Sequence, residues 1–529
     1  MKNEFDIIII GAGHNGLTLG AYLARSNLDV VVLERRHEEG GGLATEELTQ
    51  PGFLHNTHAN YHTFVDLAPP INDLELVSHG VEYVKPAVQM ASIYPDQTCL
   101  LIHDDLDRTV ESIAQLSPND AQTFKRLYKE AHRFVNLLLN TLMYEPPLSI
   151  KELTKALSVF DVSSHSEFLN VKLRTWTISD FLNAHFTDPK VKAHLGFHAA
   201  VCGYVTDKRG LAIGFPLLVG KIDNWHLSKG GSHKVAHALW RDLANHGGLL
   251  ITDAEVASII VKDNIATGVK LSDGGQIFAR KAVVSTVSVE QTFGQFLNQS
   301  DLPAELLEEL KTITHQPYSL FSVHLALKDK PDYTAKKHDP EVNNAWVVNL
   351  GYSSLEQLNS DWSLIRAGHV PEPCPNVAVN TIYDPTDAPE GYFTGLIRQF
   401  VPFNVNQTGS GTWRYLSSHY GNKLISKWAE FAPNISEAVI DYVTYSPLDI
   451  AEKLVNMVNG DWMMGEVALE NMLDQRPTKL LGNYKTPVSG LYMGGSTQHP
   501  HGFITFAPAY NALSVIAADL NIDPWWREV

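Results

Sequence analysis

The first forty residues of the chain carry the feature that most constrains its fold. An apolar run, residues 5–10, leads directly into the stretch Gly11-Ala12-Gly13-His14-Asn15-Gly16. Glu34 follows eighteen residues later, at the end of a second apolar run over residues 30–33. A strand, a glycine turn and a helix in this order, followed by an acidic residue at this distance, predict a Rossmann-type unit that binds a dinucleotide.

Each position in this stretch has a physical role in the prediction. Gly11 lets the chain turn sharply off the strand, and Gly13 has no side chain to block the backbone's approach to a diphosphate. Gly16 permits close packing of the helix expected over residues 17–26, whose N-terminal N–H groups face the diphosphate. Glu34 can accept hydrogen bonds from the adenosine ribose, and its charge would repel a 2′-phosphate, which argues against NADP.

A second glycine cluster indicates which dinucleotide is bound. Gly40-Gly41-Gly42 begins six residues after Glu34. A nicotinamide dinucleotide rarely needs another glycine loop here, whereas a flavin has to be held along its whole length. We therefore expect FAD rather than NAD, although such a cluster can also be a surface turn. The expected contacts from the two loops are Gly11, Gly13, His14, Asn15, Gly16, Glu34, Arg35, Gly41, Gly42, Leu43 and Ala44.

The second glycine cluster also carries a family resemblance. Residues 34–47 (ERRHEEGGGLATEE), followed by Pro51-Gly52-Phe53, resemble the flavoprotein superfamily of amine oxidases and phytoene desaturases. Members usually have an arginine after the paired glycines, where this chain has Gly42. The chain therefore looks more like the phytoene-desaturase-related branch that includes pyridine nucleotide-disulfide oxidoreductase domain-containing protein 2. The missing arginine would have been one charge partner of the diphosphate.

The resemblance extends to the second half of the chain. In the superfamily, residues 229–285 return to the FAD domain with a helix over 233–246 and strands over 251–261, 266–271 and 276–285, and the backbone near Val256 lies against the adenine. Near the C-terminus, Gly494 and Gly495 end a strand, and a helix is expected over 509–520, beside Pro508 and Asn511. In the family this helix N-terminus points at the flavin's N1–C2 side, where positive N–H groups stabilise the reduced ring.

The order of these segments predicts an α/β fold, α+β overall, with a discontinuous domain. The Rossmann-like FAD-binding domain is expected over residues 1–75, 225–295 and 440–529, with a mixed substrate-binding lobe over 76–224 and 296–439. The first insert reads as mainly helical, and Ser117-Pro118-Asn119-Asp120 predicts the start of a helix that runs to about residue 143. The second insert combines β-rich pieces, such as 318–327 and 376–382, with helices such as 421–430.

The resemblance implies a reaction class. A flavin takes a hydride, and the protein supplies position, electrostatics and sometimes a base. We expect desaturation or dehydrogenation of a largely apolar, aromatic or isoprenoid-like substrate, with oxygen or a quinone as the electron acceptor. Two alternatives keep the same fold: a flavin-dependent double-bond isomerase without net redox change, and a noncatalytic flavin-binding interaction protein.

Histidines near both expected flavin loops are the candidates for proton transfer, because imidazole accepts and donates protons near pH 7. Three of them lie within residues 54–62, and two flank Pro500. We hypothesise that one or two of these, with a tyrosine, line the active site; hydrogen-bonded structural histidines are the alternative. The candidates are His58, Tyr61, His62, His499 and His501, with His55 beside them. His58 and His62 are four residues apart, but no HExxH pattern accompanies them, so no metal site is expected.

Composition limits the partners and the compartment. A formal net charge of −18 argues against nucleic-acid binding and against broad docking onto anionic lipid. The cysteines, Cys99, Cys202 and Cys374, form no CxxC and suit a reducing compartment. The first strand begins too early to leave room for a signal peptide, so a cytoplasmic location is expected. An apolar stripe over residues 134–143 reads as buried core, as a lid or as a peripheral membrane contact, and a homo-oligomer stays open.

Overall fold

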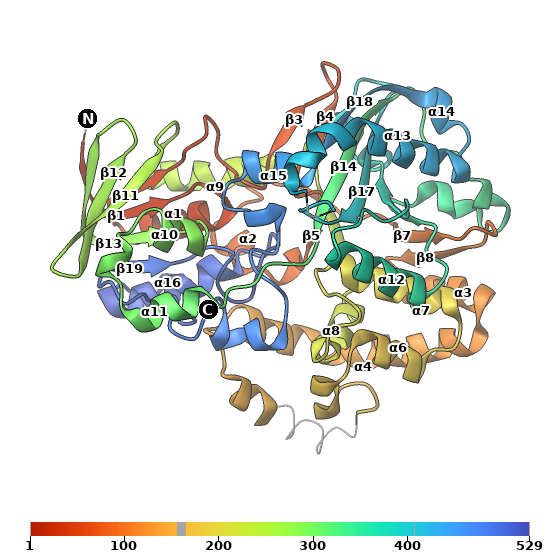
Figure 1. The fold of residues 1–529 in the computed structure, drawn as a ribbon, viewed down its shortest axis with the longest axis horizontal. Helices are drawn as coiled ribbons and strands as arrows, with labels where there is room; N and C mark the ends of the chain where they lie inside the picture. Colours follow the sequence, from red (N-terminus) through yellow and green to blue (C-terminus); the bar gives the residue numbers. More distant parts are fainter. Residues whose placement is uncertain (1, 156–165, 407, 528–529) are drawn as a thin grey trace.

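Two sheets, each assembled from segments distant in the sequence, organise the fold into two lobes (Figure 1). The protein is described by a computed structural model that covers residues 2–155, 166–406 and 408–527. The first sheet lies on the left of Figure 1 and contains the N-terminal strand. The second sheet lies on the right, with a layer of helices beneath it.

The first sheet is the Rossmann-like sheet, and its strand order is β10-β2-β1-β13-β12-β11, with β19 beside β13. Strand β1 is buried and almost continuously apolar, as expected for a central parallel strand covered on both faces. It pairs in parallel with β2 and with β13. The bounds are β1 Glu4–Ile10, β2 Val30–Leu33, β10 Leu249–Ile251, β11 Val256–Lys262, β12 Ile265–Leu271, β13 Gln276–Ser285 and β19 Leu491–Met493.

Helices cover both faces of this sheet. Helix α1 (His14–Arg25) packs against α9 (His233–Asn245) and α16 (Ala507–Leu520), so three distant segments share one core. The other face packs against α10 (Val289–Gly294) and α11 (Ala304–Leu310). A Rossmann-like α/β fold is therefore present, as the sequence predicted.

The second sheet has the order β18-β14-β17-β16-β15-β7-β8. Residues 88–103 pair with strands from residues 319–445, so the two inserts form one lobe. Strand β18 lies in this sheet, although the sequence-based boundary at residue 440 placed nearly all of it in the FAD domain. The bounds are β7 Val88–Ile93, β8 Cys99–His103, β14 Ser319–Leu327, β15 Val347–Leu350, β16 Asn376–Ala378, β17 Phe393–Val401 and β18 Val439–Tyr445.

Short strands and further helices complete the structure. The small sheets pair β3 (Thr45–Glu47) with β4 (Leu54–Asn56), and β9 (Trp225–Ser228) with β5 (His62–Thr63) and β6 (Tyr83–Val84). The remaining helices are α2 Pro69–Asp73, α3 Leu106–Leu116, α4 Pro118–Met143, α6 Ile178–His185, α7 Pro189–Val201, α8 Phe215–Val219, α12 Leu355–Arg366, α13 Trp413–Phe431, α14 Ile435–Ala438 and α15 Pro447–Lys453.

Helix α4 begins as its sequence predicted. The Ser117 hydroxyl accepts a hydrogen bond from the Asp120 N–H at 3.2 Å, which is the expected N-cap contact. On the apolar stripe of this helix, Val135, Leu139 and Met143 are buried in the core of the first lobe, while the side chains of residues 136–138 lie outside the description. No helix among the described residues is long and apolar enough to cross a membrane.

Candidate active site

A cavity of about 480 Å³ runs from the glycine loops of the first lobe into the second lobe. Its first end is bordered by residues of the Rossmann unit and of strand β11, and its other end by side chains of the second sheet and of helix α7. The first group is Ile10, Gly11, Gly13, His14, Asn15, Leu33, Glu34, Arg35, Arg36, Gly41, Gly42, Val256 and Ser272. The second group is Tyr61, Phe197, Val201, Leu320, Ser322, Asn376, Arg398, Phe400 and Trp462.

The first glycine loop separates two kinds of glycine. A Cβ at Gly16 would lie 1.9 Å from the carbonyl oxygen of Gly11, so Gly16 is required by helix–strand packing. A Cβ at Gly13 would meet nothing within 4 Å and would instead point into open space. Helix α1 begins at His14 without a side-chain cap and without an acidic residue in its first turn. Its positive end is therefore available to an anion.

Glu34 is held rigidly at the end of β2. One carboxylate oxygen accepts the Ala12 N–H and the other accepts the Arg36 N–H, both at 2.9 Å. Each oxygen keeps further acceptor capacity, because a carboxylate offers about four lone-pair sites. The carboxylate borders the cavity, where it can accept hydroxyl groups of a ribose.

The second glycine loop lies against the first. The Gly40 N–H donates to the Ala12 carbonyl at 2.8 Å, and a Cβ at Gly41 would come within 3.2 Å of the Gly13 Cα. At Gly42, where related proteins carry arginine, the methyl group of Met457 lies 3.4 Å from the position of a Cβ. The positive charges that border the cavity in this chain come instead from Arg36 and Lys453, among others.

These residues fit a bound FAD on observations of the structure itself. Within the described ranges, Asn15 Oδ1 and Arg36 Nη1 are buried polar atoms without a hydrogen-bond partner, and both side chains border the cavity. Buried polar atoms are normally satisfied, so such atoms mark a place for a ligand. An uncapped helix end, two interlocked glycine loops and a buried carboxylate are the donor set that a dinucleotide requires.

Several predicted contacts border the cavity, and others lie behind it. Gly11, Gly13, His14, Asn15, Glu34, Arg35, Gly41, Gly42 and Val256 border it. Gly16, Leu43, Ala44, Gly494, Gly495, Pro508 and Asn511 are not among its lining residues. Gly495 is packed against backbone, since its Cβ would lie 2.2 Å from the Thr286 carbonyl oxygen, and the Asn511 amide donates to the Met143 carbonyl at 2.8 Å. From the C-terminal loop, the lining includes Ser496, Phe503 and Ile504 instead.

The candidate catalytic residues divide in the same way. His58 and Tyr61 border the cavity. Burial, followed by the nearby charges of Lys453, Arg398 and Arg36, holds the pKa of His58 well below its usual range, so its imidazole is neutral at pH 7. Burial raises the pKa of Tyr61 to about 12, and its hydroxyl donates to Asn376 at 2.5 Å.

The other histidines make structural contacts. His62 contacts Ser232 at 3.0 Å and Tyr83 at 3.2 Å. His499 donates to the Leu142 carbonyl at 2.5 Å, and His501 donates to the Gly502 carbonyl at 2.8 Å. Burial lowers the pKa of His62 to about 3, of His499 to about 4 and of His501 to about 3. The structure does not bring these three to the cavity wall, and their catalytic role remains a prediction. His55 contacts the Thr49 hydroxyl at 2.9 Å.

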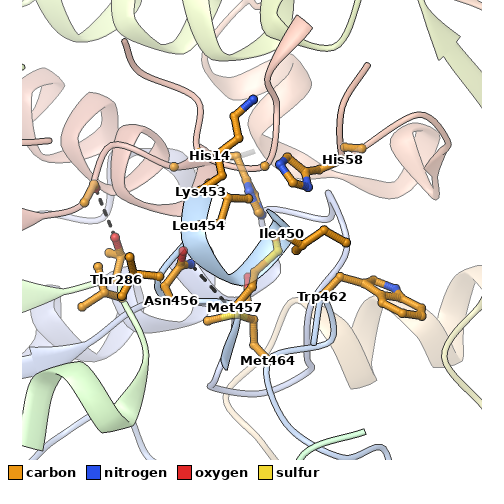
Figure 2. A pocket seen from close by; sticks show the side chains of 18 of the residues that line it. His14, His58, Thr286, Ile450, Lys453, Leu454, Asn456, Met457, Trp462 and Met464 are labelled. Atoms are coloured by element: carbon orange, nitrogen blue, oxygen red, sulfur yellow. Dashed lines mark hydrogen bonds between the residues drawn. The ribbon is translucent and has the colours of Figure 1, made fainter. Parts of the chain in front are cut away.

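Sequence reasoning missed the segment over residues 450–464, which borders the cavity between the two lobes. Figure 2 shows Ile450, Lys453, Leu454 and Met457 of this segment in the same cavity as His14 and His58. No glycine motif or spacing marks these residues. The aromatic end, with Phe197, Phe400 and Trp462, was equally hidden, because aromatic residues in a lobe of unknown topology read as ordinary core. Within the described ranges, no cluster of metal-ligating side chains is present.

Comparisons with known proteins agree with this geometry. The pattern of an NAD(P)-binding Rossmann-like domain matches residues 9–74. A limonene dehydrogenase component from Castellaniella defragrans is 33% identical over 99% of this chain and 96% of that protein. Pyridine nucleotide-disulfide oxidoreductase domain-containing protein 2 from Mus musculus is 27% identical over 98% of this chain and 94% of that protein.

A carotenoid enzyme and solved structures extend the comparison. Phytoene desaturase (neurosporene-forming) from Rhodobacter capsulatus is 24% identical over 93% of this chain and 90% of that protein. Putrescine oxidase has the same fold, with a TM-score of 0.62 at 14% identity, over 98% of this chain and 100% of that chain. An oxidoreductase from Methanosarcina mazei gives a TM-score of 0.60 at 16% identity, over 96% and 99% of the two chains. By its relatives and its site, the chain belongs to the phytoene desaturase-related family of FAD-dependent oxidoreductases.

Proposed function

We propose that this enzyme dehydrogenates a largely apolar, unsaturated organic molecule by transfer of a hydride to FAD. The observation that carries the proposal is the continuity of the cavity, which joins the dinucleotide loops to an end bordered by Phe197, Leu320, Phe400 and Trp462. A chamber of aromatic and aliphatic side chains favours an apolar substrate through burial of its surface. The relatives named for limonene and phytoene act on molecules of this class.

The cofactor and the chain have separate tasks in this proposal. FAD, when bound, supplies the redox step by accepting a hydride. The glycine loops and Glu34 hold it, and the aromatic end orients the substrate and excludes water. His58 is the residue we assign to proton removal, because its Nε2 is buried without a hydrogen-bond partner among the described residues and its imidazole is neutral. Tyr61 positions the substrate beside it, since its hydroxyl is already engaged by Asn376.

The test is anaerobic mixing of the purified, FAD-loaded enzyme with a panel of substrates, followed by absorbance. The panel contains a monocyclic terpene, a terpene alcohol, a carotenoid precursor and an amine. We expect the oxidised flavin band to bleach with one unsaturated apolar class and to return with oxygen or a quinone. Replacing His58 with Asn should slow bleaching by about 100-fold, the usual contribution of a general base, without loss of flavin.

Three results would contradict the proposal. Product formed while the flavin stays oxidised would favour the double-bond isomerase. Bleaching by the amine alone would move the substrate class away from hydrocarbons. A flavin that no compound reduces, in a correctly folded protein, would favour the noncatalytic binding protein.

A further inference from the structure

Polar side chains cross the second sheet at the cavity, among otherwise apolar neighbours. Arg398 on β17 is the register partner of Ser322 on β14 and of Asn376 on β16. Cross-strand partners project to the same face of a sheet, so these three side chains stand in one row. All three border the cavity, together with the apolar residues Leu320 and Phe400.

Arg398 is a buried charge that the protein itself does not neutralise. Its side chain is 8% exposed, and one Nη group donates to the carbonyl of His58. The guanidinium lies 5.4 Å from the centre of the Tyr61 ring, and its Nε has no hydrogen-bond partner among the described residues. Within the same ranges, Arg398 forms no salt bridge with a carboxylate, although the structure contains many such pairs elsewhere.

The surroundings make the unpaired charge more costly. His58, Lys453 and Arg36 border the same cavity, so nearby ionisable groups add positive rather than negative potential. Burial lowers the pKa of the Arg398 guanidinium, in keeping with this environment. A buried ion without a counter-charge costs several kcal/mol, which a tyrosine face and one carbonyl offset only in part.

A pure hydrocarbon would leave this cost in place. Its surface would cover the guanidinium and offer no acceptor, so binding would remove water without replacing its hydrogen bonds. A carboxylate at the same position would accept a bidentate pair from Arg398. The Ser322 hydroxyl can donate a further hydrogen bond, because this side chain borders the cavity in the same row. The apolar body of the molecule would then lie against Phe197, Phe400 and Trp462.

We propose that the substrate of this enzyme is an apolar carboxylic acid, and that Arg398 and Ser322 bind its carboxylate. The inference rests on the proposed function and deepens it by naming the substrate class. Tyr61 positions the guanidinium by lying against it, and Asn376 fixes Tyr61 through the hydrogen bond from its hydroxyl.

The experiment measures binding to the FAD-loaded enzyme by calorimetry. The probes are hexanoate, cyclohexanecarboxylate and decanoate, each paired with its methyl ester, which has nearly the same apolar body and no charge. We expect at least one acid to bind 10-fold or more tightly than its ester. Arg398→Met should abolish that preference and leave the visible flavin spectrum unchanged. Arg398→Lys should restore part of it, since a lysine keeps the charge without the bidentate geometry.

Controls separate this role from a structural one. Arg414→Met removes a positive charge from an exposed salt bridge with Glu452 and should leave the preference intact. Ser322→Ala removes only the hydroxyl and should weaken acid binding several-fold, which tests the site even where Arg398→Met fails to fold. Equal binding of every acid and its ester by the wild-type enzyme would overturn the inference. A changed flavin spectrum in folded Arg398→Met would assign the guanidinium to the cofactor instead.

The result is independent of the outcome for the proposed function. Flavin bleaching by a hydrocarbon, without any preference for acids, would keep the dehydrogenase and remove the carboxylate site. Tight acid binding without bleaching by any compound would keep the carboxylate site and remove the dehydrogenase.

Discussion

At the scale of the residue, two glycines three positions apart have different reasons to be glycine. Gly16 has no room for a Cβ because the Gly11 carbonyl oxygen occupies that position. Gly13 has room, and its φ of −68° suits any residue, so the fold alone does not require a glycine there. Gly13 is explained by what binds beside it, whereas Gly16 is explained by packing.

Substitution of the two glycines should therefore separate binding from folding. We expect Gly13→Ala to fold with an unfolding midpoint close to that of the wild type in the absence of FAD, but to bind FAD at least 10-fold more weakly. Gly16→Ala should be strongly destabilised, because backbone atoms would have to move. Thermal unfolding of the apoprotein and FAD titration give the two readouts. Unchanged FAD affinity in Gly13→Ala would place the diphosphate elsewhere.

At the scale of the element, an ion-paired histidine joins helix α10 to the segment over residues 450–464. His315 contacts Glu290 of α10 at 2.8 Å and Asp461 at 3.3 Å. Burial acts to lower the pKa of His315, but the hydrogen bonds to Asp461 and Glu290 outweigh it and raise the pKa to about 9. The histidine is therefore protonated at neutral pH and links the two lobes beside the cavity.

This link should make stability depend on pH in a defined window. The folded pKa lies above the unfolded value of about 6.5, so the contribution is complete below pH 6.5 and is lost as the pH rises through about 9. We expect the wild type to exceed His315→Gln by about 2 kcal/mol at pH 6 and by much less at pH 9.5. Unfolding midpoints of both proteins at the two pH values provide the measurement. A difference that does not change with pH would show that the histidine acts through packing alone.

At the scale of the whole molecule, the cavity belongs to neither lobe alone. Glu34 and Gly13 come from the first lobe, and Phe400 and Arg398 come from the second. A ligand that contacts both lobes stabilises their arrangement as well as each part, because it binds the native state and not the unfolded chain.

FAD should therefore raise the unfolding midpoint of the entire chain in a single transition. At a free concentration 100 times its dissociation constant, the expected stabilisation is about 2.7 kcal/mol. ADP is the matched control, since it reaches only the Rossmann end and should protect the second lobe less at equal saturation. Calorimetry, with limited proteolysis of both lobes, gives the measurement. Separate melting of a second lobe that FAD leaves unprotected would contradict the shared site.

The sequence by itself determined the cofactor end of the protein. Strand β1, helix α1 and Glu34 are contiguous, so local periodicity and glycine stereochemistry were enough to predict the unit. The N-cap at Ser117 was readable for the same reason, because a cap depends on residues a few positions apart. The family resemblance added FAD and the return of the chain to the first sheet.

Only the tertiary structure decided the substrate end. The row of Ser322, Arg398 and Asn376 depends on the register of strands up to seventy-six positions apart, which no local pattern encodes. The same holds for residues 450–464, which lack a motif, and for His62, His499 and His501, whose contacts draw them away from the cavity wall. A dinucleotide site is built from one continuous segment, whereas a substrate chamber is built where sheets and helices meet, and that meeting is fixed by packing across the whole chain.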